Sequence, residues 1–175
     1  MRGAEAAEVV YTDDIWVGYR YFSTKDIQTA YPFGYGLSYT QFQYTDLHLS
    51  GQTFRDELTV SVKVTNVGKT AGKEAVQVYL SAPGQSMPKP AMELKAFGKT
   101  GLLAPDESER LTFTIHLMDL ASFDSATASW IAEQGVYEIH IGASSLNMRG
   151  ALSFQLPEER IVERVSKALI PERGI

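Results

Sequence analysis

Cysteine is absent from this sequence of 175 residues, and its absence removes three kinds of chemistry at once. Without thiols the chain can form no disulfide, carry no thiol nucleophile and offer no thiolate to a metal ion. The absence also favours a reducing, cytoplasmic compartment, although many secreted proteins lack cysteine too. The first residues, Met1–Ala4, lack the apolar segment of a signal peptide, but this start says nothing about targeting if the natural chain extends upstream.

An excess of positive charge and a long apolar run are missing as well. The 16 lysines and arginines are scattered and are outnumbered by 21 acidic residues, which gives a formal net charge of −5. A nucleic-acid partner would call for clustered Lys and Arg, so the sequence predicts no nucleic-acid binding. No apolar run reaches the roughly 18 residues that a membrane-spanning helix needs, so the sequence predicts no membrane partner either.

Apolar and polar residues alternate with a period of two through most of the chain, and this pattern predicts strands. The clearest example is the segment 58–64, in which Leu and Val alternate with Thr, Ser and Lys. The segment 42–49 shows the same pattern with one irregularity in its middle, which predicts a bulge or a kink. Further strands are expected around 76–80, 94–97, 111–117, 128–132, 137–141 and 152–156, with a helical turn at 119–123.

The number and spacing of these segments predict the fold class. About seven short strands separated by turn signals are typical of an all-β, immunoglobulin-like antiparallel β-sandwich. Since no cysteine pair can join the two sheets, the fibronectin type III-like variant fits better than the antibody variant. A chain of 175 residues has room for one such domain with appendages, because domains commonly have about 100–150 residues.

Aromatic residues crowd into the N-terminal part of the chain. Eleven of the nineteen Phe, Trp and Tyr residues lie between Tyr11 and Tyr44. Each large ring buries about 150–250 Å² when it packs, so a free arm of this kind would expose on the order of 2,000 Å². The largest apolar patch on a monomer is only about 300–600 Å². The arm should therefore be covered by another surface, either other domains of a longer protein or a second copy of the chain.

The local pattern of the arm predicts short strands at 9–11 and 15–22, a turn at 23–26 and a seam at 31–40. The seam combines four aromatic residues with Pro32 and two glycines, which let the backbone bend. A segment that bends repeatedly while it carries large rings is expected to lie tightly against another surface.

Beyond Pro157 the period changes. Ile161, Val165 and Leu169 recur every four residues between charged residues, which predicts a short amphipathic helix in the tail. Acidic residues at its start and basic residues towards its end suit the helix dipole. A helix this short is marginal alone, so we expect it to dock or to fray.

Four stretches that follow one another along the chain resemble the motifs of one enzyme family. They are VGYRY at 17–21, PFGYGLSY at 32–39, VKVTNVGKTAGKE at 62–74 and MELKAF at 92–97. Together they resemble the C-terminal fibronectin type III-like domain of glycoside hydrolase family 3, the family of β-glucosidases and β-xylosidases. The resemblance extends from about Tyr11 to Leu156.

Two departures from the family pattern leave this resemblance intact. Asp13-Asp14 stands where Glu-Gly is common, and Ala96 stands where Gly is usual. We therefore divide the chain into an N-terminal connector arm over residues 1–36, a fibronectin type III-like sandwich over 37–157 and a helical tail over 158–175.

The resemblance also implies a function. Glycoside hydrolysis needs two carboxyl groups that flank the scissile bond, and in family 3 these come from a barrel and an α/β-sandwich domain. No residue of this chain matches either motif, so we expect an inactive accessory domain without a cofactor. The parent enzyme would cleave terminal β-linked glucose or xylose with retention.

The expected role of the domain is to brace the catalytic domains and to extend the substrate rim. The loop 82–91 is long enough to reach towards such a rim. Two alternatives remain, namely a free-standing carbohydrate-binding module and a sandwich that binds another protein.

The aromatic residues of the arm, with one arginine among them, are the candidate interface residues. We expect them to dock onto the catalytic barrel and the α/β-sandwich domain, while stacking on an oligosaccharide and self-association are alternatives. The arginine would pair with a carboxylate across the seam or stack on a ring. The set comprises Trp16, Tyr19, Arg20, Tyr31, Phe33, Tyr35 and Tyr39.

The acidic residues give no catalytic pair. Asp13 and Asp14 are adjacent, so in a strand their side chains would point to opposite faces and could not flank one bond. Asp13, Asp14, Asp124 and Glu133 are all expected in solvated turns.

The histidines and serines give no site either. His48, His116 and His140 lie far apart in expected strands, so we expect them at the surface and see no metal-ligand spacing. Ser144-Ser145 lacks the glycines of a nucleophile elbow.

Overall fold

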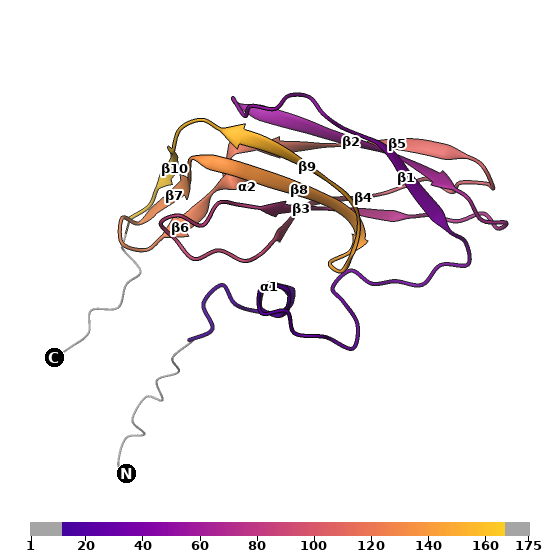
Figure 1. The fold of residues 1–175 in the computed structure, drawn as a ribbon, viewed down its shortest axis with the longest axis horizontal. Coiled ribbons are helices and arrows are strands. Elements are labelled where there is room, and N and C mark those ends of the chain that lie inside the picture. The colour runs from indigo at the N-terminus through magenta and orange to yellow at the C-terminus, as the bar shows by residue number, and fades with distance from the viewer. Residues whose placement is uncertain (1–11, 167–175) are drawn as a thin grey trace, which may run out of the picture.

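The computed structural model of the chain describes residues 12–166. Two antiparallel sheets enclose one hydrophobic core, and the N-terminal arm lies outside them (Figure 1). The first sheet consists of β1 (Phe42–Leu49), β2 (Glu57–Asn66) and β5 (Ser108–His116), in the order β1-β2-β5. The second consists of β3 (Ala75–Ser81), β4 (Glu93–Lys99), β8 (Gly135–Ser144) and β9 (Asn147–Leu156), in the order β4-β3-β8-β9. The predicted all-β sandwich is confirmed.

Strand β1 has the irregularity that its sequence predicts. Its pairing with β2 shifts between Thr45 and His48, and Asp46 between them has a left-handed φ of 52°. A bulge changes the phase of the alternation. As a result, Tyr44 before the bulge and Leu47 within it both pack on the core.

Strands β2 and β3 differ in how many of their faces are covered. In β2 the alternation places Val60, Val62 and Val64 in the core without exposed surface, and each such side chain contributes about 1.5–3 kcal/mol. In β3, Gln77 and Tyr79 on the outer face are buried as well. The outer face of β3 is covered because the arm lies against it.

Three short strands form a separate sheet at one end of the sandwich (Figure 1). They are β6 (Ser122–Asp124), β7 (Ser129–Ala132) and β10 (Arg160–Arg164), in the order β10-β7-β6. The predicted tail helix is therefore wrong over β10, while Leu169 lies outside the described residues. A short helix is marginal alone, whereas pairing with β7, for example Ile161 with Ile131, gives the tail backbone hydrogen-bond partners.

The arm forms helix α1 (Tyr19–Thr24) where a strand was expected, so that prediction is wrong. Gly18 has a φ of 56°, which ends the extended backbone. The helix then makes its own hydrogen bonds, from the N–H of Phe22 to the Gly18 carbonyl at 3.2 Å and from that of Lys25 to the Tyr21 carbonyl at 2.9 Å. The strand expected at 9–11 lies outside the described residues.

Helix α2 (Leu117–Leu120) is a single turn that begins two residues before the turn predicted at 119–123 and overlaps its start, and it packs against β5 and β7. The acidic turns are mostly as expected. Asp13 and Asp14 are exposed in a turn, and Asp124 accepts backbone N–H groups within the β6–β7 turn. His48 and His116 are exposed, as predicted.

Glu133 is not in a solvated turn, which corrects the sequence prediction. Its carboxylate lies 2.6 Å from Nζ of Lys89, and the two side chains are only 3% and 4% exposed. It also accepts hydrogen bonds from the backbone N–H of Ser86, at 2.7 Å, and from the Ser86 hydroxyl. This buried ion pair fastens the loop 82–91 to the segment that precedes β8.

The buried ion pair generates a stability prediction. Burial alone would raise the pKa of Glu133, but the bonds from Lys89 and Ser86 outweigh it and hold that pKa below its usual value. Glu133→Gln leaves the Lys89 charge buried without a counter-charge, so we expect a loss of about 3–5 kcal/mol of unfolding free energy at neutral pH. Urea denaturation of the chain measures it.

The pH dependence gives the control. A carboxyl group with a depressed pKa stabilises the fold above its unfolded pKa, and that stabilisation is lost as the pH falls through the folded pKa. The difference between wild type and Glu133→Gln should therefore shrink as the pH falls below the usual pKa of a glutamate and through the lowered pKa of Glu133. Glu159→Gln, at an exposed position, should change little. Equal stabilities of the two variants at neutral pH would contradict the prediction.

Candidate interdomain docking surface

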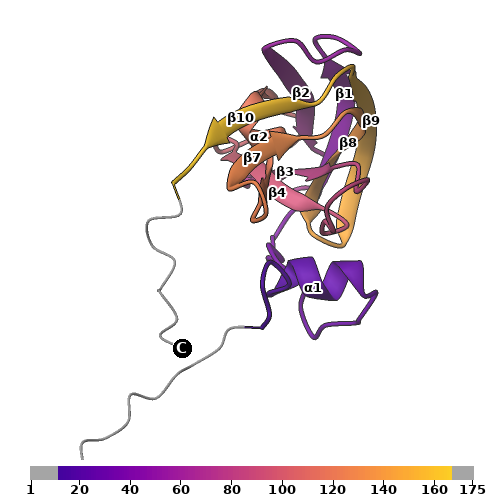
Figure 2. The ribbon, with the colours of Figure 1, turned by 90° about the vertical axis from the view of Figure 1, so that its left-hand side faces the viewer.

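The arm lies along the outer face of the sheet β4-β3-β8-β9. Figures 1 and 2 show α1 beside this sheet from two directions, with the following segment rising to the start of β1. This course brings part of the predicted interface set onto the sheet and leaves the rest facing away from it.

Tyr19 is the arm residue that contacts the sheet most closely. Its ring stacks on Phe33, with ring centres 4.6 Å apart, and meets the edge of the buried Tyr79 at 5.9 Å. Its hydroxyl oxygen accepts the backbone N–H of Leu94, in β4, at 2.8 Å. Two predicted interface residues, Tyr19 and Phe33, are therefore brought together, and both help to attach the arm to its own sandwich.

Gln77 fixes the seam at its middle. Its side-chain amide donates to the carbonyl oxygens of Gly34, at 3.1 Å, and Ala143, at 2.9 Å. Its Oε1 accepts the hydroxyl of Tyr79 at 2.5 Å. Gly34 has a φ of 77°, and a Cβ added there would lie 2.1 Å from Oε1 of Gln77. The seam can approach the sheet this closely only because residue 34 is glycine.

Asn66 fixes the end of the seam. This buried side chain accepts the hydroxyl of Thr40 at 2.6 Å. Its amide donates to the carbonyl oxygens of Thr70, at 2.8 Å, and Leu103, at 2.9 Å. Neither Gln77 nor Asn66 was a candidate from the sequence, although Asn66 lies in one of the matching motifs and Gln77 is a polar residue in an otherwise apolar strand.

Trp16 and Arg20 contribute to a second contact between the arm and the sandwich. They line a hollow of about 610 Å³ together with Phe123 and Trp130, whose rings lie 5.5 Å apart. The Arg20 guanidinium lies 3.5 Å from the carboxylate of Glu93. Its ionic partner is therefore within this chain.

The remaining predicted residues face solvent. Tyr31, Tyr35 and Tyr39 are 74%, 50% and 99% exposed, and the rings of Tyr31 and Tyr35 lie 5.5 Å apart. Leu37, which the sequence pattern assigned to the start of the sandwich, is 90% exposed. We call Tyr31, Tyr35, Leu37 and Tyr39 the seam surface. It is a row of large apolar side chains on a backbone that is hydrogen-bonded from behind.

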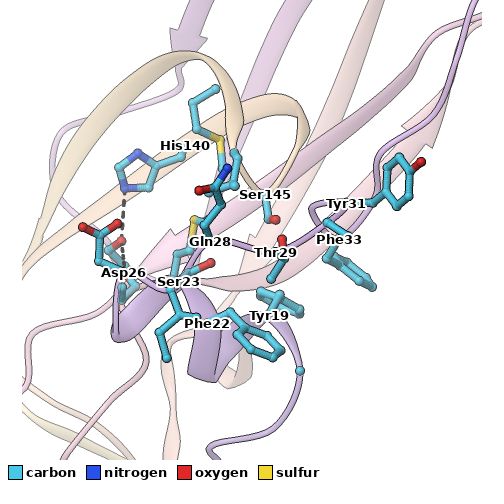
Figure 3. Close-up of a pocket in the computed structure, with 18 of the residues that line it drawn as sticks. Tyr19, Phe22, Ser23, Asp26, Gln28, Thr29, Tyr31, Phe33, His140 and Ser145 are labelled. Atoms are coloured by element: carbon cyan, nitrogen blue, oxygen red, sulfur yellow. Dashed lines mark hydrogen bonds between the residues drawn. The ribbon is translucent and has the colours of Figure 1, made fainter.

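A broad cavity of about 1340 Å³ opens between the arm and the sheet (Figure 3). Its lining joins rings of the arm, such as Phe22, to Met148 and His140 of the sheet. His140 is half-buried, which corrects its prediction as a surface residue. Its Nε2 lies 3.0 Å from the Ser81 hydroxyl, which itself donates to the Ala91 carbonyl at 2.5 Å, so Nε2 carries the proton.

This site offers contacts rather than catalytic groups. Within residues 12–166, no three His, Asp or Glu side chains come close enough together to hold a metal ion. No helix in that part of the chain is long and apolar enough to cross a membrane.

The contact between Gly34 and Gln77 can be tested by substitution. An L residue in the left-handed region costs about 1–2 kcal/mol, and in Gly34→Ala the new methyl group would also displace Gln77. We expect this variant to loosen the arm, so that backbone amides of residues 19–36 exchange with deuterium faster than in the wild type. Gly36→Ala is the matched control, because a Cβ at Gly36 meets no atom within 4 Å. Indistinguishable exchange in the two variants would show that Gln77 does not hold the seam.

Comparison with known proteins gives relatives for the whole described fold. The family model described as a fibronectin type III-like domain matches residues 74–145. A β-glucosidase from Bacteroides ovatus is 44% identical over 147 residues, which cover 83% of this chain and 20% of that protein. β-Glucosidase A from Butyrivibrio fibrisolvens is 41% identical over 184 residues, covering 93% of this chain and 22% of that protein.

A solved structure agrees with these relatives. The structure of β-glucosidase 3B from Thermotoga neapolitana in complex with α-D-glucose matches with a TM-score of 0.82 and 49% identity, over 87% of this chain and 21% of that one. The chain thus spans about a fifth of the length of the proteins that it matches. The strands, the arm and these likenesses lead to one assignment: the chain belongs to glycoside hydrolase family 3, as the fibronectin type III-like accessory domain of that family.

Proposed function

We propose that this chain is the bracing domain of a β-glucosidase and that its seam surface packs against the enzyme's catalytic domains. The observation that supports this most is the exposure of Leu37 and Tyr39, at 90% and 99%. Burial of a large apolar side chain stabilises by about 1.5–3 kcal/mol, so these residues represent stabilisation that the sandwich itself does not use.

The way in which the seam is held supports docking. Gln77 bonds the backbone of the seam at Gly34, and Asn66 accepts the side-chain hydroxyl of Thr40 at its end, so the outward side chains need little ordering when a partner binds. Preorganisation of this kind lowers the entropic cost of an interface. A flexible connector would pay that cost in full each time the domains came together.

The chemistry of the reaction would belong to the rest of the enzyme. By likeness to its β-glucosidase relatives, the parent protein would hydrolyse terminal β-D-glucosides or β-xylosides with two carboxyl groups outside this chain. In this domain the fully buried carboxylate of Glu133 is occupied by Lys89 and Ser86. That pair would hold the loop 82–91 in a fixed position, suited to the edge of a substrate site in the complete enzyme.

The alternatives have less support. A carbohydrate-binding module would present a planar row of exposed rings on one sheet, but in the described strands only Phe97 and Phe123 have rings exposed this way, and they lie in different sheets. Stacking of an oligosaccharide on the rings of the arm, and self-association through the aromatic arm, both stay predictions. The second is tested by the size of the chain in solution.

The proposal can be tested on the gene and on the complete enzyme. The reading frame that contains this chain should also encode a barrel and an α/β-sandwich domain, and the complete protein should hydrolyse aryl β-glucosides. The 175-residue chain alone should show no turnover above background. In the complete protein, Leu37→Ala combined with Tyr39→Ala should lower the thermal midpoint and the activity together, because the interface loses apolar contact.

Two controls separate docking from folding. The same double substitution should leave the stability of the 175-residue chain nearly unchanged, since both side chains are exposed there. Met118→Ala, at a 42% exposed residue on α2, should leave the complete protein unaffected. A frame that encodes no catalytic domain, or a complete protein that is indifferent to the double substitution, would refute the proposal.

A further inference from the structure

A hollow at the end of the seam has a charge opposite to that of the whole chain. It has a volume of about 590 Å³ and lies between the segment 34–42 and the edge where β3 begins and β8 ends. Its lining includes the exposed cations Lys73, Lys99 and Arg149, with Glu74 as the single carboxylate. The formal net charge of the chain is −5, so this local excess of positive charge runs against the overall composition.

None of the three cations is held in a close ion pair in the described part of the chain. No carboxylate there forms a salt bridge with any of them at 4.0 Å or less. The Arg149 guanidinium lies 5.8 Å from the centre of the Tyr44 ring, a cation–π contact, and the Arg149 side chain is exposed.

Glu74 is already occupied by another group. It accepts the Tyr44 hydroxyl at 3.0 Å. Burial raises the pKa of Glu74, and the hydrogen bond from Tyr44 and the charge of Arg149 offset only part of that rise. The lining therefore combines three cations with one carboxyl group that already accepts a hydrogen bond.

Leu37 connects this charge to the seam surface, because it lines the hollow while it is 90% exposed. A partner that covers Leu37 therefore approaches the hollow that the three cations line. Cations that are removed from water without a counter-charge cost free energy, whereas a carboxylate opposite them forms charge-assisted hydrogen bonds. Complementary charge of this kind also fixes the register of an interface.

We propose that the hollow binds an acidic patch on the surface of the enzyme's other domains, in which Asp or Glu carboxylates meet Lys73, Lys99 and Arg149 around the apolar contact at Leu37. This proposal rests on the proposed function and names the chemistry of its partner surface. It assigns two roles to one interface, since apolar side chains of the seam supply burial and the cations select the orientation.

Zero-length crosslinking of the complete protein tests the contact directly. A carbodiimide joins a lysine amine to a carboxylate only when the two groups touch. We expect peptides that link Lys73 or Lys99 to an Asp or Glu outside residues 1–175, identified by mass spectrometry. Crosslinks between two copies of this chain, or none from either lysine while other lysines react, would overturn the proposal.

Charge reversal gives the second readout. Arg149→Glu should lower the thermal midpoint of the complete protein by at least about 2 °C at low ionic strength, and by less in about 1 M salt, where the Debye length is about 3 Å. Arg164→Glu makes the same change of charge and is the control. Arg164 is exposed on β10, at the opposite end of the sandwich (Figure 1), so this substitution should have no such effect.

The outcomes distinguish this proposal from the one on which it rests. If the Leu37→Ala and Tyr39→Ala substitutions destabilise the complete protein while Arg149→Glu behaves like Arg164→Glu, docking stands and the acidic partner is wrong. If neither has an effect, both proposals are wrong. In the 175-residue chain alone, Arg149→Glu should keep the fold, as judged by an unchanged circular dichroism spectrum.

Discussion

The side-chain amide of Gln77 is the contact on which the shape of this domain depends. It stands on the outer face of β3, where the alternating pattern alone would leave it in water, and it is only 6% exposed. Its hydrogen bonds reach Gly34 in the arm, Ala143 in β8 and Tyr79 beside it. A buried amide is costly unless its groups are satisfied, so the sheet and the arm need each other at this point. Without that contact the arm would be a connector; with it, the arm is a third layer on the sandwich.

The motifs that carry the family resemblance meet around this layer. Gly34 belongs to one motif and contacts Gln77, while Asn66 belongs to another and holds Thr40 at the end of the seam. Gly68 shows the same constraint, since a Cβ there would lie 2.1 Å from the Thr40 hydroxyl. The residue types at positions far apart in the chain are therefore restricted by the same requirement, namely the attachment of the seam to the sandwich. This explains how a domain without catalytic groups can keep recognisable motifs.

The alternation of apolar and polar residues was enough to predict the sandwich. A strand such as β2 has one face in the core and one in water, so every second residue of its sequence is apolar. The alternation failed where a partner distant in the chain decides the outcome. Residues 19–24 contain good strand formers, yet they form α1 because Gly18 turns the backbone and no strand pairs with them in the described chain. From the sequence, Glu133 was predicted in a solvated turn, because nothing local shows that the fold places Lys89 beside it. The interface residues were predicted by type, but their division into inward and outward sets depends on Gln77, which periodicity treats as an ordinary surface position.

That division has an energetic meaning. Phe33 stacks on Tyr19, and Tyr19 packs against Tyr79, so these rings attach to the sheet the segment that carries the exposed Tyr31, Tyr35, Leu37 and Tyr39. A monomer gains nothing from presenting such side chains on an ordered backbone, because a loop that turned them inwards or frayed would be more favourable in water. Under the proposed function, a partner covers these side chains and also meets the cations beside Leu37. On that proposal the domain is one preorganised half of an interface, in which hydrogen bonds hold the backbone, apolar side chains are buried and charge selects the orientation.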